Sequence, residues 1–169
     1  MQNASTETLL TSAAERARAY LAGLDERSVR PDPEAVAALV RFDEPLPDDP
    51  ADPQAVLRLL DETGSPATMA MAGPRFFGFV IGGALPVTLA ANWLAGAWDQ
   101  NSALYNVAPA TAVLEQVALG WLLDLLGLPP DAAGAFVTGA TVANFTALAA
   151  ARHAVLRQAG WNVEADGLW

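Results

Sequence analysis

The feature that most constrains this chain is a run of 23 uncharged residues, positions 76–98. A run of this length can cross a lipid bilayer as a helix. Its composition argues against that use, because it contains four glycines, Pro86 and Asn92, and Asp99 follows it directly. We therefore expect a strip of protein interior and no membrane partner.

Charge and residue counts exclude several classes of function. The chain has 169 residues, which fits one globular domain or part of a larger one, and its net charge of -10 repels nucleic-acid phosphates and anionic headgroups. Without cysteine it can form no disulfide and no thiolate metal ligand. All nine basic residues are arginines, so this chain alone cannot complete a mechanism that needs a lysine amine. We expect no secretory signal at residues 1–8 and a cytoplasmic location.

Apolar spacing predicts a mainly helical N-terminal part. Steps of three and four residues indicate a first helix that ends near Gly23. Asp-Pro pairs at Asp32 and Asp52 are start signals for two more helices, and Gly64 is expected to end the later one. Between them, residues 42–53 hold four prolines and five acidic residues, which predicts a linker.

After Gly64 charges become sparse, which indicates the interior of a protein. The elements expected there are a loop over 73–83, a buried helix over 86–98, a polar loop over 99–108, a buried helix from Pro109 to Gly127, a short buried strand over 135–138 and a last helix over 141–158.

The turn before that last helix carries the strongest chemical motif. Thr138, Gly139, Ala140 and Thr141 are small residues between the expected strand and the helix. Small residues let backbone N–H groups approach an anion, and the helix N-terminus and the Thr141 hydroxyl add to the attraction. The motif predicts a phosphate cradle, although a tight turn capped by Thr141 explains the same residues equally well.

Other polar residues give weaker signals. His153 is the single histidine, so we expect a solvated helix residue and no metal site. The polar residues 99–102 are compatible with the lining of a pocket and with a solvated loop. No nucleophile triad, Walker loop or dinucleotide fingerprint is present.

Four blocks in order resemble the pyridoxal-phosphate-dependent group II amino acid decarboxylases, the aromatic-amino-acid and glutamate decarboxylase family. They are GPRFFGFVIGGALP from Gly73, WDQNSALYNVAPATAVLE from Trp98, WLLDLLGLP from Trp121 and AFVTGATVANFTALAAARHAVL from Ala135. The resemblance implies the N-terminal portion of an α/β fold-type I transferase-like fold, that of the aspartate aminotransferase superfamily. It also implies pyridoxal 5'-phosphate as cofactor, an amino acid substrate and a homodimer.

The resemblance also assigns roles to single residues. The implied cofactor-binding residues are Gly139, Ala140, Thr141 and Asn144. The implied substrate-pocket residues are Phe79, Val80, Asn101 and Tyr105, the last two on a loop that reaches toward the neighbouring subunit. Family members often carry histidine at the position of Gly73 and a Gly-Ser pair at the cradle, where this chain keeps a hydroxyl in Thr141.

The resemblance further implies that two segments of the chain have different roles. Residues 1–72 would be a helical dimerisation segment with the linker 42–53, and residues 73–169 the incomplete start of the cofactor-binding domain. The family's ring-stacking histidine, its ring-nitrogen aspartate and its Schiff-base lysine lie downstream of the last matched block. No catalytic residue is therefore expected in this chain.

We interpret the chain as the N-terminal part of a decarboxylase, a lyase that is inactive without a lysine from the rest of the enzyme or from a complementary chain. The alternative is a non-catalytic helical dimerisation or regulatory module derived from the same family. The sequence does not exclude the other reactions that enzymes of this fold catalyse. The phenylalanines at 76, 77 and 79 are only a hint of an aromatic or apolar substrate.

Overall fold

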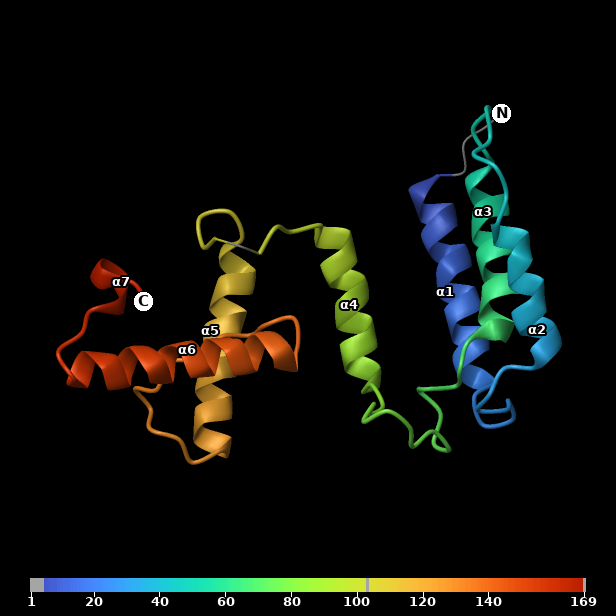
Figure 1. Ribbon diagram of the computed structural model, residues 1–169. Helices are drawn as coiled ribbons and strands as arrows, with labels where there is room; N and C mark the ends of the chain where they lie inside the picture. Colours follow the sequence, from blue (N-terminus) through green and yellow to red (C-terminus); the bar gives the residue numbers. More distant parts are fainter. Residues whose placement is uncertain (1–4, 103, 169) are drawn as a thin grey trace. The chain divides into compact units, whose positions relative to one another are not determined.

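Helices make up all the regular structure of the described residues, 5–102 and 104–168, in the computed structural model (Figure 1). The α-helices are α1 (Thr6–Ala22), α2 (Pro33–Ala37), α3 (Pro53–Leu59), α4 (Pro86–Trp98), α5 (Pro109–Leu125), α6 (Ala140–Gln158) and α7 (Val163–Asp166). Tighter or wider helical turns are η1 (Ala38–Phe42), η2 (Leu60–Gly64) and η3 (Ser65–Ala67). The chain divides into two units, residues 1–94 and 95–169.

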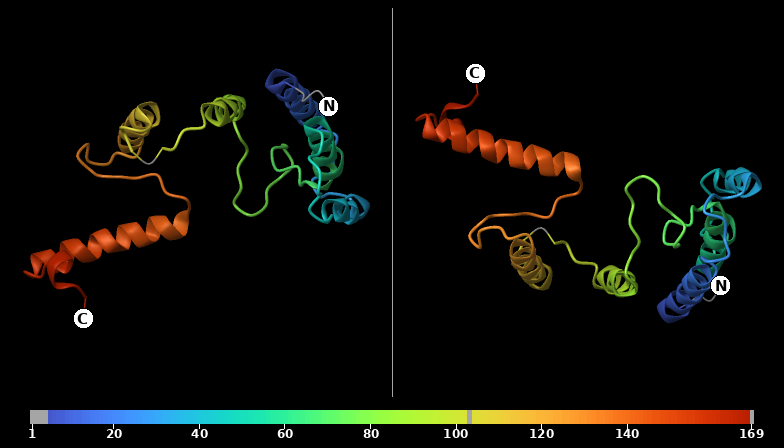
Figure 2. Two further views of the ribbon diagram at one scale, coloured as in Figure 1. Left: turned by 90° about the horizontal axis from the view of Figure 1, so that it is seen from above. Right: turned by 90° about the horizontal axis from the view of Figure 1, so that it is seen from below.

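In the first unit α1, α2 and α3 lie beside one another (Figures 1 and 2). Helix α1 begins after Ser5, whose hydroxyl accepts a hydrogen bond from the Thr8 amide, and it ends at Gly23 as predicted. Helices α2 and α3 begin at the two Asp-Pro pairs, again as predicted. Asp52 caps α3 through its side chain, whereas the Asp32 carboxylate makes no capping bond. Residues 43–52, within the predicted linker 42–53, are exposed and non-helical.

The prediction for Gly64 was wrong in its detail. Helix α3 passes into the π-helical turn η2, and Gly64 keeps a right-handed conformation with φ -79° and ψ -49°. A glycine that ends a helix usually takes a left-handed conformation instead. Helical turns therefore continue through η3, and the helical path ends only at Thr68, whose backbone is extended.

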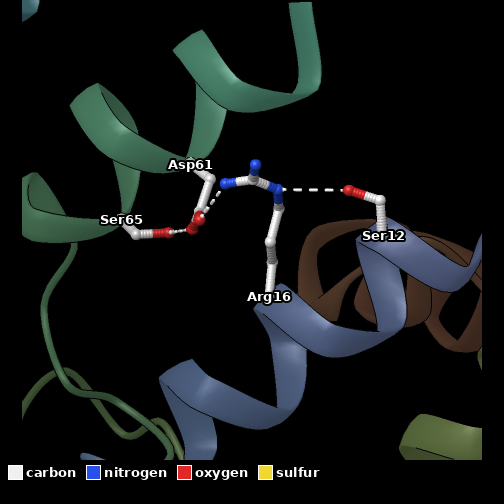
Figure 3. A network of polar contacts seen from close by, with 4 residues as sticks. All are labelled: Ser12, Arg16, Asp61 and Ser65. Carbon is white, nitrogen blue, oxygen red and sulfur yellow. Dashed lines mark hydrogen bonds and ion pairs between the residues drawn. The ribbon is translucent and has the colours of Figure 1, made fainter. Parts of the chain in front are cut away.

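A polar network joins α1 to η2 (Figure 3). The Arg16 guanidinium donates to the Asp61 carboxylate over 2.7 Å, and the Ser65 hydroxyl donates to the other carboxylate oxygen, also over 2.7 Å. Arg16 also reaches the Ser12 hydroxyl at 3.4 Å. The hydrogen bonds from Ser65 and Arg16 lower the pKa of Asp61 below its ordinary value of 3.8, against a smaller opposing effect of burial.

In the second unit the predicted helix ends are confirmed. Helix α5 begins at Pro109, and the chain after it turns at Gly127, which has φ +63°. Helix α6 is followed by Gly160, with φ +83°. Both glycines adopt the left-handed conformation that ends helices, as their positions predicted. Helix α4, which spans the boundary between the units, has the predicted bounds.

Two expectations for the later part of the chain were wrong. Residues 135–138 were predicted to form a buried strand, yet they form no strand, because a strand needs a paired neighbour and the described residues offer none. Helices α4 and α5 were predicted to be buried, yet neither has a buried residue. Trp121 and Leu125 on α5 are 69% and 79% exposed, so the predicted apolar face exists but is not covered within the described chain.

The described chain has little buried core. Its buried apolar residues are Leu24, Ala70, Phe76 and Ala108, of which the first three belong to the first unit. None of the helices in the described residues is long and apolar enough to span a membrane.

The Asp61 network makes stability depend on pH. Because the pKa of Asp61 is lower in the folded chain than in the unfolded chain, its stabilisation is complete above about pH 4 and is lost as the pH falls through the folded value. We expect Asp61→Asn to lower the free energy of unfolding at pH 7 by about 1 kcal/mol, because the network is partly exposed. We also expect it to reduce the loss of stability below pH 4.

Urea unfolding followed by circular dichroism, repeated between pH 3 and 7, measures both effects. Glu62→Gln is the matched control, because Glu62 is an exposed neighbour that forms no ion pair with the described residues. If the Asp61→Asn chain loses as much stability in acid as the original chain, the acid-dependent loss does not come from Asp61.

Candidate cofactor and substrate site

The phosphate cradle predicted from the sequence lies at the first turn of α6. Gly139 precedes the helix in an extended conformation, with φ 170° and ψ 171°. A Cβ atom placed on Gly139 would meet no other atom within 4 Å, so the surface beside the helix start is open. That surface is accessible to an anion.

Backbone amides point to the same place. The amides of Ala140, Thr141 and Val142 precede the first helical bond, which the Ala143 amide donates to the Gly139 carbonyl over 3.1 Å. The first turn contains no acidic residue that would compete with an anion. Unpaired N–H groups and the helix dipole together favour negative charge here.

The side chains add a hydroxyl and an amide. Thr141 is the second residue of α6 and not its cap, so the alternative of a turn capped by Thr141 was wrong. Its exposed hydroxyl makes no recorded hydrogen bond within the described chain, in contrast to Thr146, whose hydroxyl donates to the Val142 carbonyl over 2.8 Å. Asn144 follows Thr141 by three residues, which places both on one face of the helix.

Phe79 and Val80 form a turn in the first unit. The Ile81 amide donates to the Gly78 carbonyl over 3.1 Å, and both central residues, Phe79 and Val80, have φ 57°. Positive φ at both central positions defines a type I′ turn, which normally contains Asn-Gly. In bulky L-residues this conformation costs about 1–2 kcal/mol per residue.

Both side chains of this turn are exposed, Phe79 by 80% and Val80 almost completely. Phe79 borders a cavity of about 620 Å³. The other residues that line it are Arg30, Pro31, Pro33, Val36 and Met69. A strained turn that presents an aromatic ring at a largely apolar cavity suits the binding of an apolar group.

Asn101 and Tyr105 lie in the loop between α4 and α5, part of the second unit. Residue 103 within this loop lies outside the described residues. The loop ends in a turn where the amides of Val107 and Ala108 donate to the Leu104 carbonyl, and Ala108 is buried. Tyr105 is 62% exposed. Asn101 and Tyr105 thus share a unit with the cradle at α6, whereas Phe79 and Val80 belong to the other unit.

Sequence reasoning missed the arginines that hold the first unit together. Arg27 and Arg75 donate to backbone carbonyls 38 to 50 residues away in the sequence. The only available signal was the position of Arg75 inside the block that resembles a family. The His153 Nδ1 atom lies 3.9 Å from Oε1 of the exposed Glu164. No metal-binding cluster occurs in the described residues.

Comparison with known proteins identifies the family. Residues 33–164 match the pyridoxal-dependent decarboxylase conserved domain, so the chain belongs to the pyridoxal-dependent decarboxylase family. The cofactor implied by this family is pyridoxal 5'-phosphate. Among curated proteins the chain is similar to the aromatic-L-amino-acid decarboxylase of Bacillus atrophaeus, with 30% identity over 116 residues. The match covers 69% of this chain and 24% of that relative, so the chain spans about a quarter of its length.

The residues of the α6 turn fit one part of this cofactor. Three amides, a hydroxyl and a first turn without acidic residues suit its phosphate. The cofactor's aldehyde reacts with a lysine amine in enzymes of this kind, and this sequence contains no lysine. The chain therefore has residues suited to the phosphate and none suited to the aldehyde.

The turn at Phe79 yields a stability test. Replacing Phe79 and Val80 by Asn and Gly supplies the residues that a type I′ turn favours, so we expect unfolding to become less favourable by about 1–3 kcal/mol. Phe77→Asn is the control, because Phe77 is 91% exposed and lies outside the two positive-φ positions. Urea unfolding measures the change, and a double variant no more stable than the control would exclude this turn conformation.

Proposed function

We propose that this chain is the N-terminal part of a pyridoxal 5'-phosphate-dependent amino acid decarboxylase and that it supplies the cofactor's phosphate site. The observation that carries the proposal is the start of α6, where the first-turn amides, the Thr141 hydroxyl and Asn144 share one end of a helix. Family membership makes phosphate the natural anion for this site. In the proposal, the fold-type I sheet of the complete enzyme adds the strand pairing that residues 135–138 lack here.

When bound, the cofactor would supply the electron sink that accepts electrons as the substrate's carboxylate leaves. The task of this chain is to bind and orient. Amides of residues 140–142 and the Thr141 hydroxyl donate to the phosphate, and Asn144 supports the same face of α6. Phe79 and Val80 contact the substrate's side chain, and Asn101 and Tyr105 contribute from the α4–α5 loop. The lysine comes from another part of the enzyme or from a complementary chain.

Residues 1–72, most of the first unit, provide the dimer contacts in this proposal. A largely apolar groove of about 890 Å³ runs along this unit, lined by residues of α1 such as Leu21 and by residues of α4 such as Leu89 and Trp93. Leu10 and Leu21 remain 60% and 39% exposed. Helical apolar surface of this kind is stabilised when a second copy covers it, which supports a homodimer.

The alternative is a non-catalytic helical module that dimerises without binding the cofactor. The same groove on the first unit supports this alternative. The alternative gives no role, however, to the first-turn amides of α6 and the Thr141 hydroxyl. The substrate is an amino acid in the main proposal. An aromatic side chain is favoured by Phe79 at its apolar cavity and by the similarity to an aromatic-L-amino-acid decarboxylase.

Thr141→Val tests the phosphate site, since it removes the hydroxyl and keeps the shape of the side chain. We expect the 169-residue chain to bind pyridoxal 5'-phosphate weakly and the variant to bind it about tenfold more weakly still, because a hydrogen bond to a charged group is lost. Thr146→Val is the matched control, because its hydroxyl is already bonded to its own helix. Titration calorimetry with the cofactor, and with pyridoxal lacking the phosphate, measures the difference.

The lysine-free chain alone should not decarboxylate amino acids above the rate of the free cofactor. Equal cofactor affinity in both threonine variants would reject the phosphate site. A chain that dimerises yet shows no phosphate-dependent binding would favour the non-catalytic module.

A further inference from the structure

Two segments that are far apart in the sequence contact one another in the first unit. The turn after α1, residues 24–29, meets residues 65–76, which follow η2. The Ala70 amide donates to the Val29 carbonyl over 3.1 Å, and Leu24, Ala70 and Phe76 are buried. We call this contact the 24–29/65–76 joint.

Arg27 holds one side of the joint. Its guanidinium donates to the carbonyls of Ser65, Pro66 and Thr68 at distances of 2.5 to 3.2 Å. The same group lies over the ring of Tyr20, 4.7 Å from the ring centre, and the Tyr20 hydroxyl bonds to the Thr68 side chain over 2.9 Å. This arrangement fixes residues 65–68 against the end of α1.

Arg75 holds the other side. Its guanidinium donates to the Asp25 carbonyl over 2.9 Å and to the Arg27 carbonyl over 2.5 Å. Arg27 thus contributes to both sides of the joint. Its backbone carbonyl accepts a hydrogen bond from Arg75, and its own side chain binds residues 65–68. Arg75 directly precedes buried Phe76, the last residue of the joint, and the next residue, Phe77, is exposed.

The Phe79 turn follows within a few residues. A Cβ on Gly78 would lie 3.3 Å from the Phe76 ring, so the backbone packs closely on this buried side chain. The strained Phe79–Val80 turn comes next, and strained backbone persists only where its surroundings hold it. On the side that precedes the turn, the backbone is held by the packing of Gly78 on Phe76 and by the two hydrogen bonds from Arg75.

The cavity at Phe79 depends on the same joint. The wall residues Arg30, Pro31, Pro33 and Val36 follow the 24–29 turn. Met69 belongs to the other segment of the joint, residues 65–76, and Phe79 follows that segment. The two walls are therefore joined through the contacts of the joint, which include the bonds from Arg75 to the Asp25 and Arg27 carbonyls, the bonds from Arg27 to residues 65–68 and the Ala70–Val29 backbone bond.

We propose that Arg75 is a positioning residue that holds Phe79 at this cavity and so tunes binding of the substrate's side chain, an inference that rests on the proposed function. Arg75 touches no reacting atom in this account. It acts by fixing the backbone four residues before Phe79, through two hydrogen bonds that alanine cannot make.

Limited proteolysis tests the positioning step without any need for activity. Chymotrypsin cuts after aromatic residues, so cleavage after Phe77 and Phe79 in the 169-residue chain reports how often the loop opens. We expect Arg75→Ala to raise cleavage there by about tenfold, with cleavage after Trp161 unchanged. Arg75→Lys should restore most of the protection, because an ammonium can donate to the same two carbonyls.

Arg58→Ala is the matched control, because Arg58 is exposed on α3 and makes no recorded polar contact within the described chain. If Arg75→Ala does not fold, Arg75→Gln replaces it, since its shorter amide should leave the loop equally open. Original cleavage rates in Arg75→Ala or Arg75→Gln, or equal acceleration at every site without rescue by Arg75→Lys, would overturn the proposal.

Kinetics of the complete decarboxylating enzyme test the functional step. We expect Arg75→Ala to raise KM for its amino acid substrate about tenfold and to leave kcat within about twofold, because only binding of the side chain is loosened. A fall of about tenfold in kcat with an unchanged KM would contradict this role of Arg75. Absence of decarboxylation in the unmodified enzyme would reject the proposed function, whereas the cleavage rates would still decide whether Arg75 positions the loop.

Discussion

The first unit depends on guanidinium groups that bind backbone carbonyls. Only a few of its apolar side chains are buried, so packing alone offers little stability. Arg27 and Arg75 instead bind five carbonyls of segments that are remote in sequence. Arginine suits this role because its planar group carries five donors and stays charged. The exclusive use of arginine for positive charge in this chain is consistent with such structural work. The strained Phe79 turn and its cavity are built on this joint.

Local signals predicted the helices well, because their causes are local. Proline after aspartate started α2 and α3, and Gly23, Gly127 and Gly160 ended helical segments where expected. Signals that depend on a partner failed. An apolar run at 135–138 indicates a strand only if another strand pairs with it, and the apolar faces of α4 and α5 say nothing about which surface covers them. The prediction that Gly64 ends a helix was wrong, because the helical path continued through a π-turn with no sequence signature.

The candidate site was predictable to different degrees. Small residues before an expected helix located the cradle, and the structure placed Thr141 inside the first turn and not at the cap. Arg27 and Arg75 could not be found in the same way, because their contacts join positions 38 to 50 residues apart and leave no periodic pattern. The Phe79–Val80 turn opposes ordinary turn chemistry, which favours Asn-Gly at these positions. Conflicts between local preference and observed backbone are expected where function selects the side chains.

The central claim is that the first turn of α6 binds the phosphate of pyridoxal 5'-phosphate. Its most direct test is a titration of the isotopically labelled 169-residue chain with this cofactor, followed through backbone amide signals in NMR spectra. The account predicts that the largest shifts occur at Gly139, Ala140, Thr141 and Val142, and that inorganic phosphate competes for the same signals. Shifts confined to other segments, or none at residues 139–142 at saturating cofactor, would contradict it.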